Sequence, residues 1–330
     1  MRIPRLRTVA CAALSSALLA TSAFAAGQDV TVVVKLGGIP WFNAMEKGIQ
    51  KAGKELSLDA AMFGPTQPDP AQQVRAVEDL IAKKVKVIAV VPNDAKALEP
   101  VFERAKAAGI PVITHESPDQ QGNTWDIELT DAKSYGEIHM KKLAELMNGE
   151  GEYIVYVGGL TVPLHNAWAD AAIAYQKEHF PNMKLAADRY GVAESVDESY
   201  KTAIDAMLAH PNLKGILTFG SQGPIGAGRA IKEKNKVGKV FLVGGFSPNQ
   251  GKKLLEEGVI AEGYIWNPME AGVAIVNVAK LLIDGKPITD GMEIPGMGKV
   301  SIDTEKRTIR ANKIQAINKE TVNDLAALGL

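Results

Sequence analysis

The stretch that decides the fold is VTVVVKLGGIPWFNAMEKG, residues Val30 to Gly48. Its β-branched run, Val30–Val34, predicts a strand buried on both faces, as is typical of a parallel sheet covered by helices. A Gly-Gly-Ile-Pro segment (37–40) then leads into a helical pattern that begins near Trp41. The stretch therefore predicts the first strand–helix unit of an α/β sheet.

Polar and aromatic residues follow this strand at the place where a ligand site is expected. Open α/β sheets bind ligands outside the carboxyl ends of their strands, and here that position carries Lys35, Trp41, Phe42 and Asn43. A cation, two aromatic rings and an amide are the parts needed to hold a small polar molecule. The alternative interpretation is that Trp41 and Phe42 only pack the first helix against the sheet.

The first 25 residues have the pattern of a secretory signal peptide. Arginines at positions 2, 5 and 7 precede an apolar run at 8–20, and residues 23–25 form a small-x-small cleavage site. Cleavage after Ala25 leaves 305 of the 330 residues. The single cysteine, Cys11, is lost with the peptide, so the exported chain is expected to have neither a disulfide nor a cysteine nucleophile.

The net charge of the chain does not indicate binding to nucleic acid or to an anionic membrane. The whole chain carries a formal charge of −1 at pH 7, and loss of the three arginines changes it to about −4. Hydrophobic residues make up 46% of the chain, and no apolar run of membrane length follows residue 25. These features predict a soluble globular protein, for which this length favours two domains.

Strand and helix patterns alternate along the chain in two successive sets. Buried strands are predicted at 85–91 and 110–114 in the first set, and at 153–157, 216–219 and 240–243 in the second. Each set predicts a mostly parallel sheet with right-handed crossovers. No Ser/Gly-rich linker separates the sets. The predicted fold class is therefore α/β, with two doubly wound parallel-sheet lobes that face each other across a cleft.

The loops after the predicted strands collect amides, aromatic rings and single charges. These groups suit a hydroxyl-rich ligand, because carboxylates and amides bond hydroxyls and aromatic faces cover the C–H side of a sugar. The candidate ligand-binding residues are Lys35, Trp41, Phe42, Asn43, Asn93, Asp94, Glu116, His165, Asn166, Ser221, Gln222, Phe246, Trp266 and Asn267.

Three of these candidates have a structural interpretation beside the functional one. Asn93 and Asp94 precede a helical pattern and are also good helix caps, and His165 is also compatible with a satisfied structural histidine. Glu116 is different, because a carboxylate directly after a buried strand must either be paired within the protein or contact a ligand.

Enzyme signatures are missing from the sequence. No G-x-G-x-x-G follows the first strand, GFSPNQGK (245–252) does not have phosphate-loop spacing, and no G-x-S-x-G occurs. The five histidines show no metal-ligand spacing. The sequence therefore predicts a binding protein without catalytic residues, cofactor or metal.

Six stretches of the chain are typical of a known family: VVKLGG with WF (33–42), GPTQPD (64–69), VITHES (112–117), LTVPLHNAW (160–168), IWNP (265–268) and IPGMGKV (294–300). In these stretches the chain resembles the type I periplasmic solute-binding proteins of ABC transporters, and within them the autoinducer-2-binding and rhamnose-binding branch. The resemblance spans the mature chain.

The resemblance implies ligand contacts at Lys35, at Trp41 and Phe42, at Glu116, and in the loops at 165–166, 221–222 and 266–267. The chain departs from the family pattern at Glu116, where the family usually has Asp. It also has Leu164-His165 where the autoinducer-2 pattern has Asp-Gln. The loop GSQGPIG (220–226) likewise does not reproduce the Pro-x-Ala arrangement of that pattern. These departures favour a small sugar or polyol as the ligand, with autoinducer-2 as the alternative.

The resemblance also implies the domain organisation and the partners. A three-segment hinge is expected near 129–133, 266–269 and 291–294, which gives one lobe of 27–129 plus 268–291 and another of 130–267 plus 292–330. The expected protein is a periplasmic monomer that closes on its ligand and docks on an ABC permease served by an ATPase. A secreted α/β enzyme acting on a small carbohydrate is the remaining alternative. A repressor effector lobe is disfavoured by the signal peptide and by the lack of an N-terminal helix-turn-helix.

Overall fold

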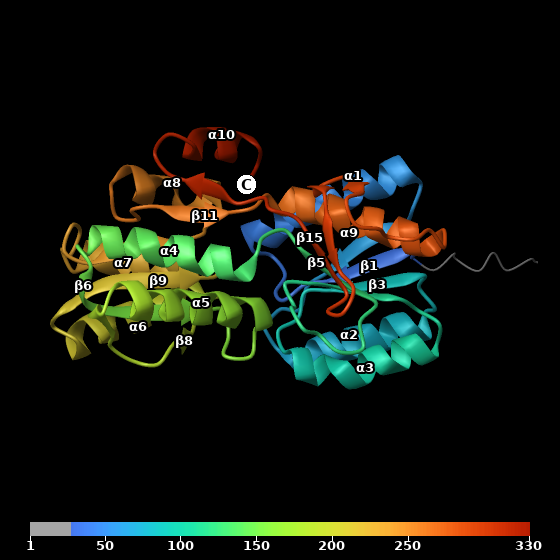
Figure 1. The fold of residues 1–330 in the computed structure, drawn as a ribbon, viewed down its shortest axis with the longest axis horizontal. Coiled ribbons are helices and arrows are strands. Elements are labelled where there is room, and N and C mark those ends of the chain that lie inside the picture. The colour runs from blue at the N-terminus through green and yellow to red at the C-terminus, as the bar shows by residue number, and fades with distance from the viewer. Residues whose placement is uncertain (1–27) are drawn as a thin grey trace, which may run out of the picture.

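Two α/β lobes lie side by side in the computed structural model, which describes residues 28–330 (Figure 1). The first lobe is built on a seven-stranded sheet of order β14-β15-β5-β4-β3-β1-β2, and the second on a five-stranded sheet of order β10-β9-β6-β7, in which β8 also pairs with β6. All neighbouring strands in both sheets are parallel except β14 and β15. The predicted fold class is confirmed.

The first lobe contains β1 (Val30–Val33), α1 (Pro40–Leu56), β2 (Ala60–Phe63), α2 (Pro70–Ala82), β3 (Val87–Val90), α3 (Ala95–Ala107), β4 (Val112–His115), β5 (Trp125–Glu128), α9 (Pro268–Ile283), β12 (Glu293–Ile294), β13 (Gly298–Lys299), β14 (Ser301–Asp303) and β15 (Thr308–Arg310). The second contains α4 (Ala132–Leu146), β6 (Glu150–Val157), α5 (Pro163–His179), β7 (Asn182–Leu185), β8 (Tyr190–Gly191), α6 (Val196–Ala209), β9 (Leu213–Phe219), α7 (Gly223–Glu233), β10 (Phe241–Gly244), α8 (Pro248–Glu256), β11 (Gly263–Ile265), β16 (Gln315–Ile317) and α10 (Val322–Ala327).

The period-two alternation of strand side chains divides each core into two layers. In the first lobe, Val30 and Val32 belong to the apolar cluster beneath α1 and α9, whereas Val33 belongs to the cluster beneath α2 and α3. Figure 1 shows these helix pairs on opposite faces of the sheet. In the second lobe, Val155 faces α4 and α5, and Ile154 faces α6 and α7. Both sheets are therefore doubly wound.

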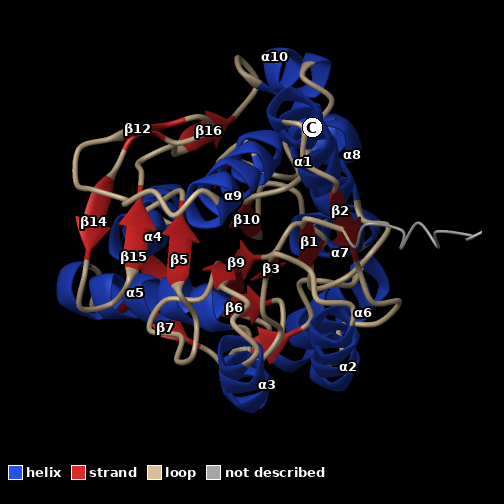
Figure 2. Ribbon diagram, turned by 90° about the vertical axis from the view of Figure 1, so that its right-hand side faces the viewer, coloured by secondary structure: helices blue, strands red, loops and turns tan. Residues whose placement is uncertain are grey.

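The C-terminal region corrects one sequence-based assignment. Residues 292–330 were expected in the second lobe, but β15 pairs in parallel with β5, and β14 extends the same sheet (Figure 2). Only β16, which pairs with β11, and α10, which packs beside α8, lie with the second lobe. The chain consequently passes between the lobes at 129–131, at 266–267 and at 311–314, so the third crossing is not at 291–294.

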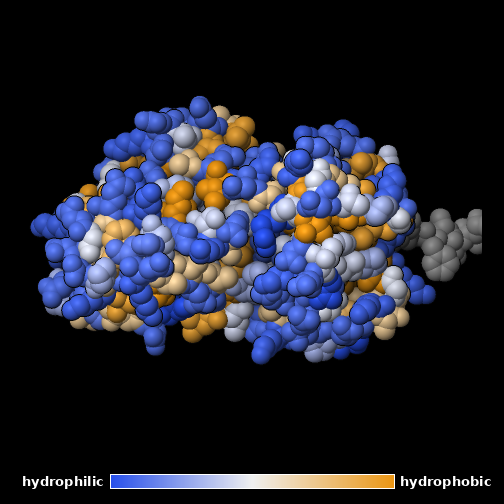
Figure 3. Space-filling model, in the orientation of Figure 1, coloured by the Kyte–Doolittle hydropathy of each residue, from blue (hydrophilic) through white to orange (hydrophobic). Residues whose placement is uncertain are grey.

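The predicted signal peptide lies outside the described residues. Within residues 28–330, no helix combines the length and the hydrophobicity needed to span a membrane. Hydrophilic side chains dominate the face drawn in Figure 3, and the apolar residues on it form separate small patches.

Helices α1 and α9 approach each other closely at glycines. A Cβ atom on Gly48 would lie 2.0 Å from the carbonyl oxygen of Met269, and one on Gly272 would lie 2.3 Å from that of Met45. Backbone cannot give way as a flexible side chain can, so residue 48 must lack a side chain.

We expect Gly48→Ala to lower the free energy of unfolding by roughly 1–3 kcal/mol, the usual cost of overpacking. Urea denaturation measures this change. The matched control is Gly228→Ala in the interior of α7, where the nearest atom to an added Cβ is the flexible Leu254 Cδ1 at 3.1 Å. That variant should be neutral or gain about 0.5–1 kcal/mol from helix propensity. Equal effects of the two substitutions would contradict the close helix packing.

Candidate functional site

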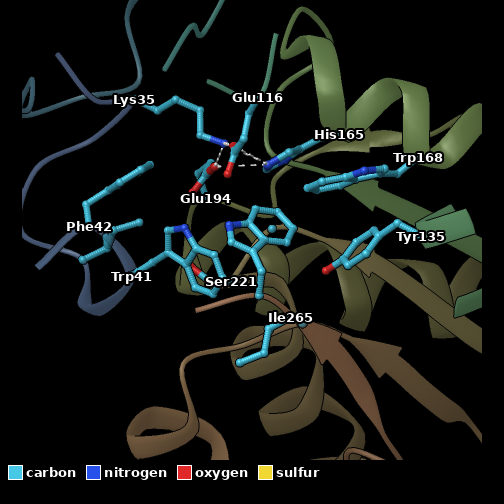
Figure 4. A pocket seen from close by; sticks show the side chains of 14 residues that line it. Lys35, Trp41, Phe42, Glu116, Tyr135, His165, Trp168, Glu194, Ser221 and Ile265 are labelled. Carbon is cyan, nitrogen blue, oxygen red and sulfur yellow. Dashed lines mark hydrogen bonds and ion pairs between the residues drawn. The ribbon is translucent and has the colours of Figure 1, made fainter. Parts of the chain in front are cut away.

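The carboxyl ends of the two sheets meet at a small cavity between the lobes. Lys35 follows β1 and Glu116 follows β4 in the first lobe, while His165 lies in the first turn of α5 and Glu194 follows β8 in the second. The cavity has a volume of about 40 Å³. Its lining consists of Lys35, Ile39, Trp41, Phe42, Glu116, Tyr135, His165, Trp168, Glu194, Gly220, Ser221, Gly245, Ile265 and Trp266 (Figure 4).

The Lys35 ammonium is the centre of the polar part of the site. Its Nζ lies 2.7 Å from Glu116 Oε2, 3.2 Å from Glu194 Oε1 and 2.8 Å from His165 Nε2. The side chains of Lys35, Glu116 and Glu194 are 5% exposed or less. One cation of the first lobe therefore contacts carboxylates of both lobes and an imidazole of the second (Figure 4).

Burial and pairing act in opposite directions on these charges. Burial disfavours the charged form of Lys35, but the Glu116 and Glu194 carboxylates outweigh it and raise the pKa of the lysine. Burial likewise opposes ionisation of Glu116, yet the Lys35 ammonium holds the pKa of this carboxyl far below its usual range. For His165, burial and then the neighbouring ammonium lower the pKa, so the neutral imidazole is favoured.

The tautomer of His165 follows from its backbone contact. Its Nδ1 lies 3.0 Å from the backbone nitrogen of Gly158, whose N–H must donate to it. A neutral imidazole that accepts at Nδ1 carries its proton on Nε2. The Nε2–H of His165 therefore faces the cavity cluster as a donor.

Aromatic rings form the apolar wall of the cavity. Trp41 and Trp266 pack edge to face with ring centroids 5.4 Å apart, and Trp168 lies 5.4 Å from Trp266. Tyr135 packs on Trp168 at 4.4 Å, and His165 stacks on the same indole at 5.2 Å. Within residues 28–330, the indole Nε1 atoms of Trp168 and Trp266 are buried and have no hydrogen-bond partner. The wall thus presents apolar faces, and two of its indole N–H groups have no partner.

Buried amides fix the backbone that carries Lys35. The Gln73 side chain donates to the carbonyl oxygens of Val34 and Val91, and it accepts from the backbone N–H of Asn93. The Asn93 amide in turn donates to the Lys35 carbonyl at 2.9 Å. The loops after β1 and β3 are held together in this way, which sets the direction of the lysine.

A second contact joins the lobes beside the cavity. The Thr161 hydroxyl of the second lobe donates to the Asn93 carbonyl of the first at 2.9 Å. The Lys35 cluster and the Thr161–Asn93 hydrogen bond therefore hold the two lobes closed around the cavity.

Two acidic side chains lie in the strand next to Glu116. Asp126 and Glu128 of β5 are both buried, and neither oxygen of the Glu128 carboxyl has a partner among the described residues. Burial first, and then the neighbouring Asp126, raise the pKa of Glu128 well above its ordinary value. The neutral form of this carboxyl is favoured, so it adds less negative charge behind the site than its residue type suggests.

The structure brings together seven of the fourteen predicted site residues. Lys35, Trp41, Phe42, Glu116, His165, Ser221 and Trp266 line the cavity. Phe42 lines the cavity and also packs in the apolar core, where it is 1% exposed. The ligand-contact and the packing interpretations of this residue are therefore compatible.

The other seven predicted residues do not line the cavity. Asn43 lies on the exposed side of α1, and Phe246 is buried in the core of the second lobe. Asp94 and Asn267 are the N-caps of α3 and α9, and Asn93 holds the Lys35 backbone. The amide of Asn166 donates to two carbonyls of the loop that precedes α5, and Gln222 bonds Ser221 and Gln250. Helix capping and loop hydrogen bonds, which use the same amides and acids as ligand binding, account for most of these positions outside the cavity lining.

Seven lining residues were not among the candidates: Ile39, Tyr135, Trp168, Glu194, Gly220, Gly245 and Ile265. Glu194 is the most important of them, because it supplies the second carboxylate. It follows β8, a strand of two residues (Tyr190–Gly191), which leaves no hydrophobic period to detect. The only available signal was its position shortly before the Ser195 N-cap of α6.

No group of three or more His, Asp and Glu side chains within residues 28–330 is arranged to hold a metal ion. The site consists of one ammonium, two carboxylates, a neutral imidazole, hydroxyls and aromatic rings. Such a set can bind a small polyhydroxylated molecule by hydrogen bonds and by contact with ring faces.

Known proteins resemble this chain in sequence and in fold. The model of the periplasmic binding protein domain family matches residues 30–287. The ribose import binding protein RbsB of Escherichia coli (strain K12) is 24% identical over 294 residues, covering 87% of this chain and 95% of that protein. The D-allose-binding periplasmic protein of the same strain is 26% identical over 280 residues, covering 82% of this chain and 88% of that protein.

Solved structures share the whole architecture. LsrB from Clostridium saccharobutylicum in complex with AI-2 has a TM-score of 0.83 at 20% identity, covering 89% of this chain and 98% of that one. An ABC transporter solute-binding protein from Clostridium phytofermentas with bound L-rhamnose has a TM-score of 0.85 at 19% identity, covering 91% and 98%. At these identities the likeness establishes the fold alone.

The buried His139 behind the aromatic wall makes stability depend on pH. Its Nδ1–H donates to the Tyr135 carbonyl at 2.8 Å, and its ring packs on Phe219 and Tyr264. Burial lowers the pKa of His139 to about 4. A histidine whose pKa is depressed on folding contributes stability above its unfolded value of about 6.5, and this contribution is lost as the pH falls toward 4.

Lowering the pH from 7 to 5 should reduce the free energy of unfolding of the wild type by about 2 kcal/mol more than it reduces that of His139→Leu. Urea denaturation at both pH values measures the difference. His179→Leu, at an exposed histidine of α5, is the control and should retain the wild-type pH dependence. Parallel pH profiles for wild type and His139→Leu would contradict the assignment.

Proposed function

This chain belongs to the periplasmic binding protein domain family, and we propose that it is the substrate-binding component of an ABC importer that captures a small sugar or polyol between its lobes. The observation that carries the proposal is the Lys35 cluster. A buried ammonium from one lobe contacts carboxylates from both lobes, next to an aromatic wall.

The chemistry of the cavity suits hydroxyl groups. Each carboxylate accepts from ligand hydroxyls, while the ammonium and the two indole N–H groups donate to ligand oxygens. The faces of Trp41 and Trp266 suit the C–H side of a ring or chain. Relatives with similar sequences or folds are described as binding ribose, allose, rhamnose, arabinose or AI-2. The departures at Glu116 and His165 lead us to favour a sugar or polyol over autoinducer-2.

Binding requires the lobes to separate and close again. The cavity of about 40 Å³ is far smaller than the roughly 300–1,000 Å³ of an ordinary ligand pocket, so a pentose needs more room than the closed lobes leave. We propose that the lobes rotate about the crossings at 129–131, 266–267 and 311–314, and that the ligand separates Lys35 from part of its present partners. The ligand-closed form then docks on the permease.

The proposed location is the periplasm, reached through a signal peptide cleaved near Ala25. The proposed partners are an ABC permease and its ATPase, with the binding protein itself a monomer. The protein is proposed to release its ligand chemically unchanged. A secreted carbohydrate-converting enzyme is the alternative, for which turnover is the distinguishing observation.

We expect a thermal-shift panel of pentoses, deoxyhexoses, tetritols, pentitols, branched sugars and autoinducer-2 to respond to a neutral sugar or polyol. A ligand at about 100 times its dissociation constant stabilises the folded state by roughly 2.7 kcal/mol, which moves the midpoint by several degrees. The responding compound should be recovered unchanged. A shift with autoinducer-2 alone would overturn the ligand class, and chemical conversion would favour the enzyme.

Glu116→Ala should abolish calorimetric binding of the responding compound, because its hydroxyls lose a charged acceptor. Lys35→Met should weaken binding comparably. Glu103→Ala, an equal charge change on the exposed side of α3, is the control and should bind as wild type does. Binding by both site variants within about twofold of wild type would show that the cavity is not the site.

Ligand entry requires separated lobes, so we propose that the ligand-free protein in solution populates a more open arrangement than the closed one described here. Saturating ligand is then expected to compact the protein, because contacts come from both lobes. Small-angle scattering with and without the responding compound measures the radius of gyration, and Glu116→Ala serves as the non-binding control. Identical scattering profiles of the wild type in both conditions would contradict ligand-driven closure.

A further inference from the structure

We propose that Glu194 and the Nε2–H group of His165 restrict the position beside Lys35 to an uncharged hydroxyl, so that the site rejects sugar acids and sugar phosphates. The inference rests on the proposed function and deepens it, because it names a chemical class that the site excludes and the residues that exclude it.

The first argument is the charge of the buried cluster. Lys35 contributes one positive charge, Glu116 and Glu194 contribute one negative charge each, and His165 is neutral, so the sum is −1. All four side chains are 5% exposed or less, and solvent therefore screens them weakly. An anionic ligand group placed here meets a like excess charge, whereas a neutral group does not.

The second argument concerns the donors that face one another. The Lys35 ammonium and the His165 Nε2–H are both donors, yet their nitrogen atoms lie 2.8 Å apart. Neither group can accept from the other in these protonation states. An oxygen atom that accepts from both removes this conflict, and His165 thereby marks the position of a ligand oxygen.

A hydroxyl fits this position better than a carboxylate or phosphate oxygen. A hydroxyl accepts from Lys35 and His165 and still has a proton to donate to Glu116 or Glu194. An ionised acid group has no proton to give, so it leaves the two carboxylates facing a third negative charge. The unused indole donors of Trp168 and Trp266 provide for further ligand oxygens without adding positive charge.

The position of Glu194 is fixed by its surroundings. A Cβ atom on Gly158 would lie 2.9 Å from Glu194 Cγ and 2.7 Å from His165 Nδ1. The bare backbone of Gly158 therefore packs between both side chains and directs them to Lys35. This arrangement makes Glu194 a specificity-determining residue of the second lobe.

The test compares matched pairs by titration calorimetry, each pair being a neutral sugar or polyol that binds and the aldonic acid or phosphate ester of the same carbon skeleton. We expect the wild type to bind the neutral member at least about a hundredfold more tightly. Glu194→Gln, which removes one negative charge at nearly constant shape, should narrow that ratio by about tenfold or more. Asp197→Asn, an equal charge change at an exposed residue of α6, should leave the ratio unchanged.

The outcomes separate this inference from the proposed function. If the wild type binds the neutral compound and its acid within about threefold, the selectivity claim is wrong and the sugar-binding function stands. If Glu194→Gln melts cooperatively, binds the neutral compound and keeps the wild-type ratio, Glu194 is not the determinant. If only acids bind, both proposals fail. The wild-type comparison decides the claim of selectivity even where a variant does not fold.

Discussion

The closed structure depends on the pairing of one buried ammonium. Lys35 is 2% exposed, and a charge so far from water is tolerated only when it is paired and hydrogen-bonded. Its partners come from two lobes, so the pairing is complete only when the lobes are together. Removing one member of such a set typically costs 3–5 kcal/mol, because the remaining charges stay buried without compensation. The same dependence makes the cluster sensitive to any ligand that offers alternative partners.

Parallel-sheet geometry explains why these groups meet. All strands that end at the cleft present their carboxyl ends to it, and each end is followed by a loop that is free to carry a polar side chain. The apolar cluster beneath α1 and α9 continues through Tyr135, Trp168 and Trp266 into the second lobe. The polar cluster therefore lies against a continuous aromatic support, which limits the side-chain freedom of His165 and Trp168.

Sequence patterns predicted the architecture, and in the first lobe they selected residues that line the cavity. The β-branched strand at Val30 and the strand before Glu116 were long enough to show their period, and the residues directly after them proved to line the cavity. Glu194 was missed because β8 has two residues. Asp94 and Asn267 cap helices and lie outside the cavity lining, and the sequence did not separate these roles because a helix cap and a ligand contact use the same side chains. The place of β15 depends on pairing with a strand about 180 residues earlier, a tertiary contact without a local signature.

The crossings between the lobes constrain how the proposed closure takes place. The backbone N–H groups of Ala311 and Lys313 donate to the carbonyls of Glu128 and Leu129, so the first and third crossings form one hydrogen-bonded ribbon. Close by, the Tyr135 hydroxyl donates to the Tyr264 carbonyl, which ties α4 to β11 just before the second crossing. Segments joined in this way cannot rotate independently without losing buried hydrogen bonds, whose loss costs about 1–3 kcal/mol each. A common bend of all three crossings keeps these bonds, and it moves Glu194 and His165 together relative to Lys35 and Glu116. The carboxylate and the imidazole of the second lobe thus reach the ligand as one unit, which is the condition for a single oxygen to be recognised from both lobes at once.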